Sequence, residues 1–161
     1  FELAIIEKKY CLKDKKIFIL GAGGVVSSII VAMKNLGSSK IILTNRTKEN
    51  AEKIKENFSD IEVVNWGEIP DFDMIINATS VGLKSNEKLD LNLQKFGPDK
   101  FFYDVIYNPK ETIFLKEAKE FGNKTENGMM MFVYQAAAAF KLWHSINPEI
   151  DNETLNLLKN D

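Results

Sequence analysis

The sequence predicts an α/β fold: a doubly wound, mainly parallel sheet with helices on both faces. The short apolar run of residues 16–20 shows no alternation and indicates a strand that is buried on both faces of a sheet, and the run of residues 73–77 is a further expected strand. Segments with helical spacing of apolar residues lie between these runs. Strands that alternate with helices imply right-handed βαβ crossovers, and 161 residues are enough for one such domain.

Residues that typically begin or end helices separate the expected elements. Gly37 is expected to end the second helix, Thr47 to cap the third, Pro148 to end the long apolar helix and Asp151 to cap the last one. The expected strands are residues 16–20, 40–44, 61–64, 73–77 and 101–105, and the expected helices are residues 1–11, 25–36, 47–58, 111–121, 127–145 and 151–158.

Three segments carry more specific expectations. Residues 1–11 bring Leu3, Ile6, Tyr10 and Cys11 near helical spacing, which predicts a short amphipathic helix. Residues 82–99 contain Gly, Ser, Asn and Pro and indicate a long, partly irregular connection. The helix over residues 127–145 contains four consecutive alanines and is expected to pack closely on a neighbour.

Composition excludes several classes of protein. The formal net charge of −2 provides no basic field for nucleic acid, and no apolar run approaches the roughly 18 residues of a membrane span. Without a signal-peptide pattern, the cytoplasm is the expected location. The single cysteine, Cys11, excludes an internal disulfide framework and is expected to be a buried or half-buried apolar residue. No metal-ligand spacing occurs, so no metal site is predicted.

A glycine-rich turn joins the first strand to the next helix. It consists of Gly21, Ala22, Gly23 and Gly24, followed by Val25. Glycines allow a tight turn and let the backbone approach a pyrophosphate at the helix N-terminus, as in Rossmann-like dinucleotide-binding domains. The alternative is a tight strand-to-helix turn that binds no ligand.

The end of the second strand indicates which dinucleotide binds. NAD-preferring folds usually carry a carboxylate there, whereas this chain has Asn45, Arg46, Thr47 and Lys48. A guanidinium pairs with a 2′-phosphate that a carboxylate would repel, so the pattern predicts NADP. The alternative is a surface arginine followed by a helix-capping threonine.

Polar stretches follow the later strands. Thr79 and Ser80 lie in the turn after the fourth strand, where ligands of doubly wound sheets bind. Residues 104–109 follow the fifth strand, and residues 127–131 precede the alanine-rich helix. The methionines there are alternatively core residues, and Gln135 either reaches a cleft or is solvated.

These stretches, in this order, resemble the shikimate dehydrogenase family. The resemblance rests on residues 21–24, 45–47, 77–82, 104–109 and 127–137, and it continues to Phe140, Leu142 and Trp143. It implies NADP-dependent, reversible reduction of 3-dehydroshikimate to shikimate, a step of the chorismate pathway of aromatic amino-acid biosynthesis.

The resemblance also implies roles for particular residues. The pyrophosphate would lie on residues 21–25 and the 2′-phosphate on residues 45–47, while Thr79 and Ser80 would be near the nicotinamide half. The nicotinamide would be flanked by Val105, Gly128 and Met131. The substrate would be reached by Tyr107 and Gln135.

Family members have a separate N-terminal substrate domain that supplies a catalytic Lys and Asp. Phe1 matches the position just after that Asp, so the chain is expected to be a piece of a longer protein and no catalytic residue is assigned. The expected division is a remnant of the interdomain hinge helix (1–11), the NADP-binding Rossmann domain (12–146) and a C-terminal helix (147–161). Neither Lys84 nor Lys110 lies in a motif that would make it a substitute for the missing catalytic lysine. His144 is expected only to interact favourably with the helix dipole near a helix C-terminus.

Two alternatives stay open: a quinate/shikimate dehydrogenase, and a stand-alone NADP-binding sensor or interaction module. Exposure of the face that meets the missing domain predicts some homodimerisation of this chain.

Overall fold

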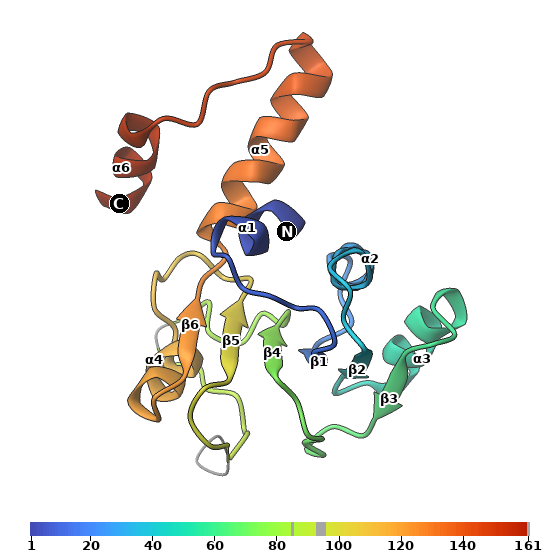
Figure 1. Cartoon of the computed structure of the whole chain (residues 1–161). Coiled ribbons are helices and arrows are strands. Elements are labelled where there is room, and N and C mark those ends of the chain that lie inside the picture. The colour runs from blue at the N-terminus through green and yellow to red at the C-terminus, as the bar shows by residue number, and fades with distance from the viewer. Residues whose placement is uncertain (85, 93–95, 161) are drawn as a thin grey trace.

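The computed structural model describes residues 1–84, 86–92 and 96–160, and its centre is a six-stranded sheet. Every neighbouring pair of strands is parallel, and the strand order is β3-β2-β1-β4-β5-β6 (Figure 1). This is the order of a doubly wound, Rossmann-like sheet, so the predicted fold class is confirmed. The strands are β1 (Lys16–Leu20), β2 (Lys40–Thr44), β3 (Glu62–Val64), β4 (Met74–Asn77), β5 (Phe101–Asp104) and β6 (Lys124–Glu126).

The helices are α1 (Glu2–Glu7), α2 (Val26–Asn35), α3 (Lys48–Asn57), α4 (Ile113–Glu120), α5 (Met129–His144) and α6 (Asn152–Asn160). Gly37 ends α2 with a φ of +79°, and the N–H of Ser38 donates to the carbonyl of Met33 as in a Schellman motif. Asp151 caps α6 by accepting from the Thr154 N–H at 2.8 Å. Both expectations for these helix ends are therefore confirmed.

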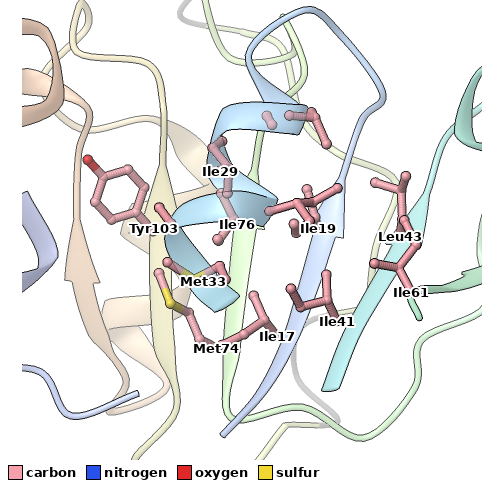
Figure 2. Close-up of a cluster of buried hydrophobic side chains, with 14 of the residues drawn as sticks. Ile17, Ile19, Ile29, Met33, Ile41, Leu43, Ile61, Met74, Ile76 and Tyr103 are labelled. Carbon is pink, nitrogen blue, oxygen red and sulfur yellow. The ribbon is translucent and has the colours of Figure 1, made fainter. Parts of the chain in front are cut away.

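Alternating side chains of each strand pack on opposite faces of the sheet. On one face, Ile17, Ile19 and Ile76 meet Ile29 and Met33 of α2, and all five are fully buried (Figure 2). Burial of each such side chain contributes about 2 kcal/mol. The apolar side chains of α2 and of the strands β1 and β4 explain why α2 packs on this face of the sheet.

The opposite face has its own core. Phe18, Ile75 and Phe102 point to this side, where Phe114 and Leu115 of α4 cover them. Leu89 and Leu91, from the connection between β4 and β5, complete the cluster. That connection contains no helix or strand among its described residues, and the expectation for residues 85 and 93–95 lies outside them.

One strand was not expected from the sequence. β6 consists of Lys124, Thr125 and Glu126 and pairs with β5 at the end of the strand order. Polar side chains at an edge carry no apolar signal, so only the pairing itself reveals this strand.

The first helix is shorter than predicted and buries a different face. α1 ends at Glu7, and its buried residues are Ala4 and Ile5, whereas the expected contacts Leu3 and Ile6 are more than half exposed. Cys11 lies beyond the helix and is exposed, so the expectation that it is buried or half-buried is wrong. Apolar spacing over so short a segment does not determine which side faces the sheet.

Thr47 occupies the N-cap position of α3, but its side chain makes no capping hydrogen bond. The expected cap is therefore correct in position and wrong in its interaction.

The long helix α5 leaves the sheet and projects beyond it (Figure 1). Val133 is its one buried residue, while Leu142 and Trp143 are 82% and 79% exposed. The expectation of close packing on a neighbour is thus wrong for most of its length within the described chain. None of the helices in the described residues is long and apolar enough to cross a membrane.

Candidate dinucleotide site

The glycine turn lies at the carboxyl edge of the sheet, between the exits of β1 and β4. Gly21 has a φ of +104°, and its N–H donates to the carbonyl of Thr44 at 2.8 Å. A Cβ at Gly21 would stand 2.7 Å from the carbonyl oxygen of Ala78. Only glycine therefore fits here, because both the backbone conformation and the close approach exclude a side chain.

Backbone donors are available where the turn enters α2. The N–H groups of Gly23, Gly24 and Val25 have no hydrogen-bond partner within the described residues. A Cβ built on Gly23 or Gly24 would meet nothing within 4 Å, so this side of the turn is open. Unpaired N–H groups at the N-terminus of a ten-residue helix favour an anion.

Asn45 connects the glycine turn to the end of β2. Its Oδ1 accepts from the N–H of Ala22 at 3.1 Å, and its Nδ2 donates to the carbonyl of Thr47 at 2.7 Å. Because both ends of the amide already have partners, Asn45 holds two loops in register.

The two cations after β2 differ in their surroundings. Arg46 is exposed and forms no ion pair or hydrogen bond with any described residue. The Nζ of Lys48 instead donates to the Oδ1 of Asn65 at 2.8 Å. Arg46 is thus the cation of this pair that is available to an anionic ligand.

A buried polar network links the exits of β4 and β5. Asp104 is fully buried; its Oδ1 accepts from Asn77 Nδ2 at 3.1 Å and from the Ile106 N–H at 3.0 Å, and its Oδ2 accepts from the Thr112 hydroxyl at 2.7 Å. Asn77 Oδ1 accepts from the Thr79 hydroxyl at 2.7 Å. Burial raises the pKa of the Asp104 carboxyl, and the three hydrogen bonds that this carboxyl accepts oppose that rise. The network orients the loops that border the site.

Two cavities meet at the glycine turn. A cavity of about 280 Å³ is bounded by residues 21–23, Asn45, Arg46, Trp66 and residues 78–81. A larger one, of about 750 Å³, lies between α1, α2 and α5 and includes Gly24, Val25, Met131 and Gln135. Thr79 and Ser80 therefore line the cavity of Arg46 rather than that of Met131 and Gln135.

The remaining predicted residues lie near the start of α5. A Cβ at Gly128 would be 2.0 Å from the carbonyl oxygen of Val105, so these two are in direct backbone contact. Tyr107 is 39% exposed and stacks on Phe132, with ring centroids 4.7 Å apart. Gln135 lies one turn beyond Phe132 and lines the larger cavity, whereas Tyr107 is not among the residues that line it.

Trp66 lines the smaller cavity but was not identified from the sequence. It lies two residues after the end of β3. The general tendency of ligands to bind beyond the carboxyl ends of strands is the signal that could have identified it.

The strand order and the glycine turn between β1 and β4 place the chain in the Rossmann class of α/β folds. Within that class it belongs to the shikimate/quinate 5-dehydrogenase family, whose model matches residues 2–104. The predicted family is therefore confirmed.

Individual relatives agree with this assignment. The chain is 57% identical to the NADP(+) shikimate dehydrogenase of Pelagibacter ubique over 158 residues, which cover 98% of this chain and 60% of that protein. It thus spans less than two thirds of this relative's length. A solved shikimate dehydrogenase in complex with NADP+ is 33% identical, with a TM-score of 0.82 over 99% of this chain and 57% of that one.

A solved relative with a different cofactor is also similar. The quinate dehydrogenase of Corynebacterium glutamicum, in complex with NAD, is 25% identical, with a TM-score of 0.79 over 92% of this chain and 56% of that one.

Proposed function

We propose that this chain is the NADP-binding domain of a shikimate dehydrogenase, which reversibly reduces 3-dehydroshikimate to shikimate with NADPH. The observation that supports this most directly is Arg46, a cation without a partner among the described residues, in a cavity beside the glycine turn. The solved relative that holds NADP+ and the NADP(+) name of the Pelagibacter relative support the same cofactor.

The residues around the smaller cavity fit the adenosine half of such a cofactor. Arg46 would bind the 2′-phosphate by a charge-assisted hydrogen bond, and Thr47 and Lys48 stand next to it. The N–H groups of residues 23–25, which have no partner among the described residues, would bind the pyrophosphate. We place Thr79 and Ser80 in this half too, because they line the same cavity as Arg46.

The larger cavity, which Met131 and Gln135 line, fits the reacting half of the cofactor. The cofactor, when bound, supplies the hydride. Met131, Val105 and Gly128 would border the nicotinamide, and Gln135 and Tyr107 would contact the substrate's polar groups. Proton transfer would need a Lys and Asp from a substrate domain outside this sequence, so we expect no turnover by this chain alone.

The test is calorimetric titration of the chain with NADP and, separately, NAD. NADP should bind far more tightly, and Arg46→Ala should weaken NADP binding by about 10- to 100-fold, as expected for a lost hydrogen bond to a charged group. NAD binding should change little, since NAD has no 2′-phosphate.

Lys16→Ala is the matched control, because Lys16 lies at the opposite edge of the sheet and pairs with Asp71 at 2.8 Å. Its NADP affinity should equal that of the unchanged chain. Binding of neither cofactor would contradict the proposal, and a preference for NAD would favour the quinate dehydrogenase alternative.

The parent reading frame distinguishes the enzyme hypothesis from the alternative of a stand-alone NADP-binding module. An upstream segment containing the Lys and Asp supports the enzyme, and a start codon just before Phe1 supports the module. A cytoplasmic location is part of the proposal and is tested by cell fractionation.

We also propose that the isolated chain dimerises through the exposed apolar residues of α5, including Leu142 and Trp143. Light scattering should give a mass that rises with concentration. A constant monomer mass would contradict this.

A further inference from the structure

A tight turn follows β3 and ends at the smaller cavity. The N–H of Glu68 donates to the carbonyl of Asn65 at 3.1 Å, and Gly67, the third residue of the turn, has a φ of +92°. A positive φ at this position is typical of a type II turn, which glycine adopts without strain. Trp66 therefore occupies the second position, where its side chain projects from a defined backbone.

Side-chain contacts hold this turn from two directions. The carboxylate of Glu68 accepts from the Asn65 N–H at 3.1 Å and from Asn65 Nδ2 at 2.7 Å. Lys48, from the start of α3, donates to Asn65 Oδ1 at 2.8 Å. The hydrogen bonds from Asn65 lower the pKa of the Glu68 carboxyl, so it is charged at neutral pH. Lys48 thus acts on the position of Trp66 through Asn65.

The indole of Trp66 is half-buried and has two sets of neighbours. It packs against the core cluster on the α4 face of the sheet, and it lines the smaller cavity with Arg46 and the glycine turn. It is the one aromatic side chain among the described residues that line this cavity. A flat ring beside a cation that is available to a phosphate suits a ligand with a base attached to a phosphorylated ribose.

We infer that Trp66 is a positioning residue for the adenine base, which stacks on its indole while Arg46 binds the 2′-phosphate. This inference rests on the proposed NADP site and adds a residue to it. Stacking of a base on an aromatic side chain contributes enough for alanine substitution to change affinity measurably. The indole would therefore contribute to affinity for the adenosine half and leave the nicotinamide half unaffected.

The chain provides its own reporter, because it has two tryptophans and the other, Trp143, lies on the exposed part of α5. In a Trp143→Phe variant all tryptophan fluorescence comes from Trp66. Titration with adenosine 2′,5′-bisphosphate should change this fluorescence saturably, at the dissociation constant that calorimetry gives. Nicotinamide mononucleotide, which lacks adenine, should leave it unchanged.

Two substitutions at position 66 separate stacking from bulk. Trp66→Leu keeps apolar volume without a ring and should weaken NADP binding about tenfold, whereas Trp66→Phe keeps a ring and should weaken it less than threefold. Trp143→Phe, the matched control, should bind NADP like the unchanged chain.

The inference is overturned if NADP binds but Trp66→Leu binds it equally well, or if saturating adenosine 2′,5′-bisphosphate leaves Trp66 fluorescence unchanged. The second measurement does not depend on whether Trp66→Leu folds. In both of these cases the proposed function stands as long as calorimetry shows that the unchanged chain binds NADP. Failure of the unchanged chain to bind NADP would instead overturn the proposed function and this inference together.

Discussion

The charged side chains are paired differently at the two ends of the sheet: the amino edge, where the strands begin, and the carboxyl edge, where they end. At the amino edge, Lys16 pairs with Asp71 at 2.8 Å, Lys15 with Asp73 at 3.4 Å, and Lys100 with Asp71 at 3.7 Å. At the carboxyl edge, Arg46 has no ionic partner among the described residues.

The buried polar groups differ as well. The carboxyl edge contains Asp104, which is fully buried and hydrogen-bonded on both oxygens, whereas Asp71 at the amino edge is 72% exposed. Ion pairs between charges at the surface contribute little to stability. At the carboxyl edge, a cation and three N–H groups have no partners among the described residues, which is why we propose that edge as the anion site.

The largest effect is expected in the glycine turn. Gly21→Ala adds a Cβ 2.7 Å from the carbonyl oxygen of Ala78, at a φ of +104°. Strain and overpacking together should lower the free energy of unfolding by about 3 kcal/mol or more, measured by urea denaturation.

Gly23→Ala is the matched control, since a Cβ there meets nothing within 4 Å. It should fold with stability within about 1 kcal/mol of the unchanged chain. If Gly21→Ala is equally stable, the turn does not require the close approach to Ala78.

A smaller loss of stability is expected from removing a carboxylate, and its size should differ between the carboxyl and amino edges. Asp104→Ala removes the acceptor from Asn77, Ile106 and Thr112 in the buried network and should cost about 3 kcal/mol or slightly less. Asp71→Ala removes only exposed ion pairs and should change the free energy of unfolding by less than about 1 kcal/mol. Similar losses for the two variants would show that the edges do not differ in this way.

The smallest effect is a dependence on pH at the amino edge. The Lys16 N–H donates to Asp73 at 2.9 Å and lowers the pKa of that carboxyl, with Lys15 adding to the shift. A lowered pKa means that the stabilisation is present above the unfolded value, about pH 4, and is lost as the pH falls through the folded value.

Asp73→Asn removes this titration while keeping a side-chain oxygen. Its Tm should lie below that of the unchanged chain at pH 7, and the gap should narrow at pH 3. A gap that stays constant between the two pH values would indicate that the charge of Asp73 contributes nothing.

Local patterns predicted most of the scaffold. Strands such as Lys16–Leu20 and Phe101–Asp104 are buried on both faces of the sheet, so most of their side chains are apolar and the pattern is visible in the sequence. The polar strand Lys124–Glu126 carries no such signal and is formed by its pairing with β5. Candidate site residues could be predicted from the sequence where one short segment supplies the chemistry, as in the glycine turn and Arg46.

The sequence by itself determined the parallel α/β fold, the family, and the candidate residues for a phosphorylated dinucleotide. Only the tertiary structure decided that Asn45 holds Ala22, that Lys48 turns away to Asn65, and that Trp66 reaches the cavity of Arg46. The tertiary structure also decided that most of α5 is exposed. The physical reason is that these features depend on contacts between segments distant in the chain, which leave no periodic trace in either segment alone.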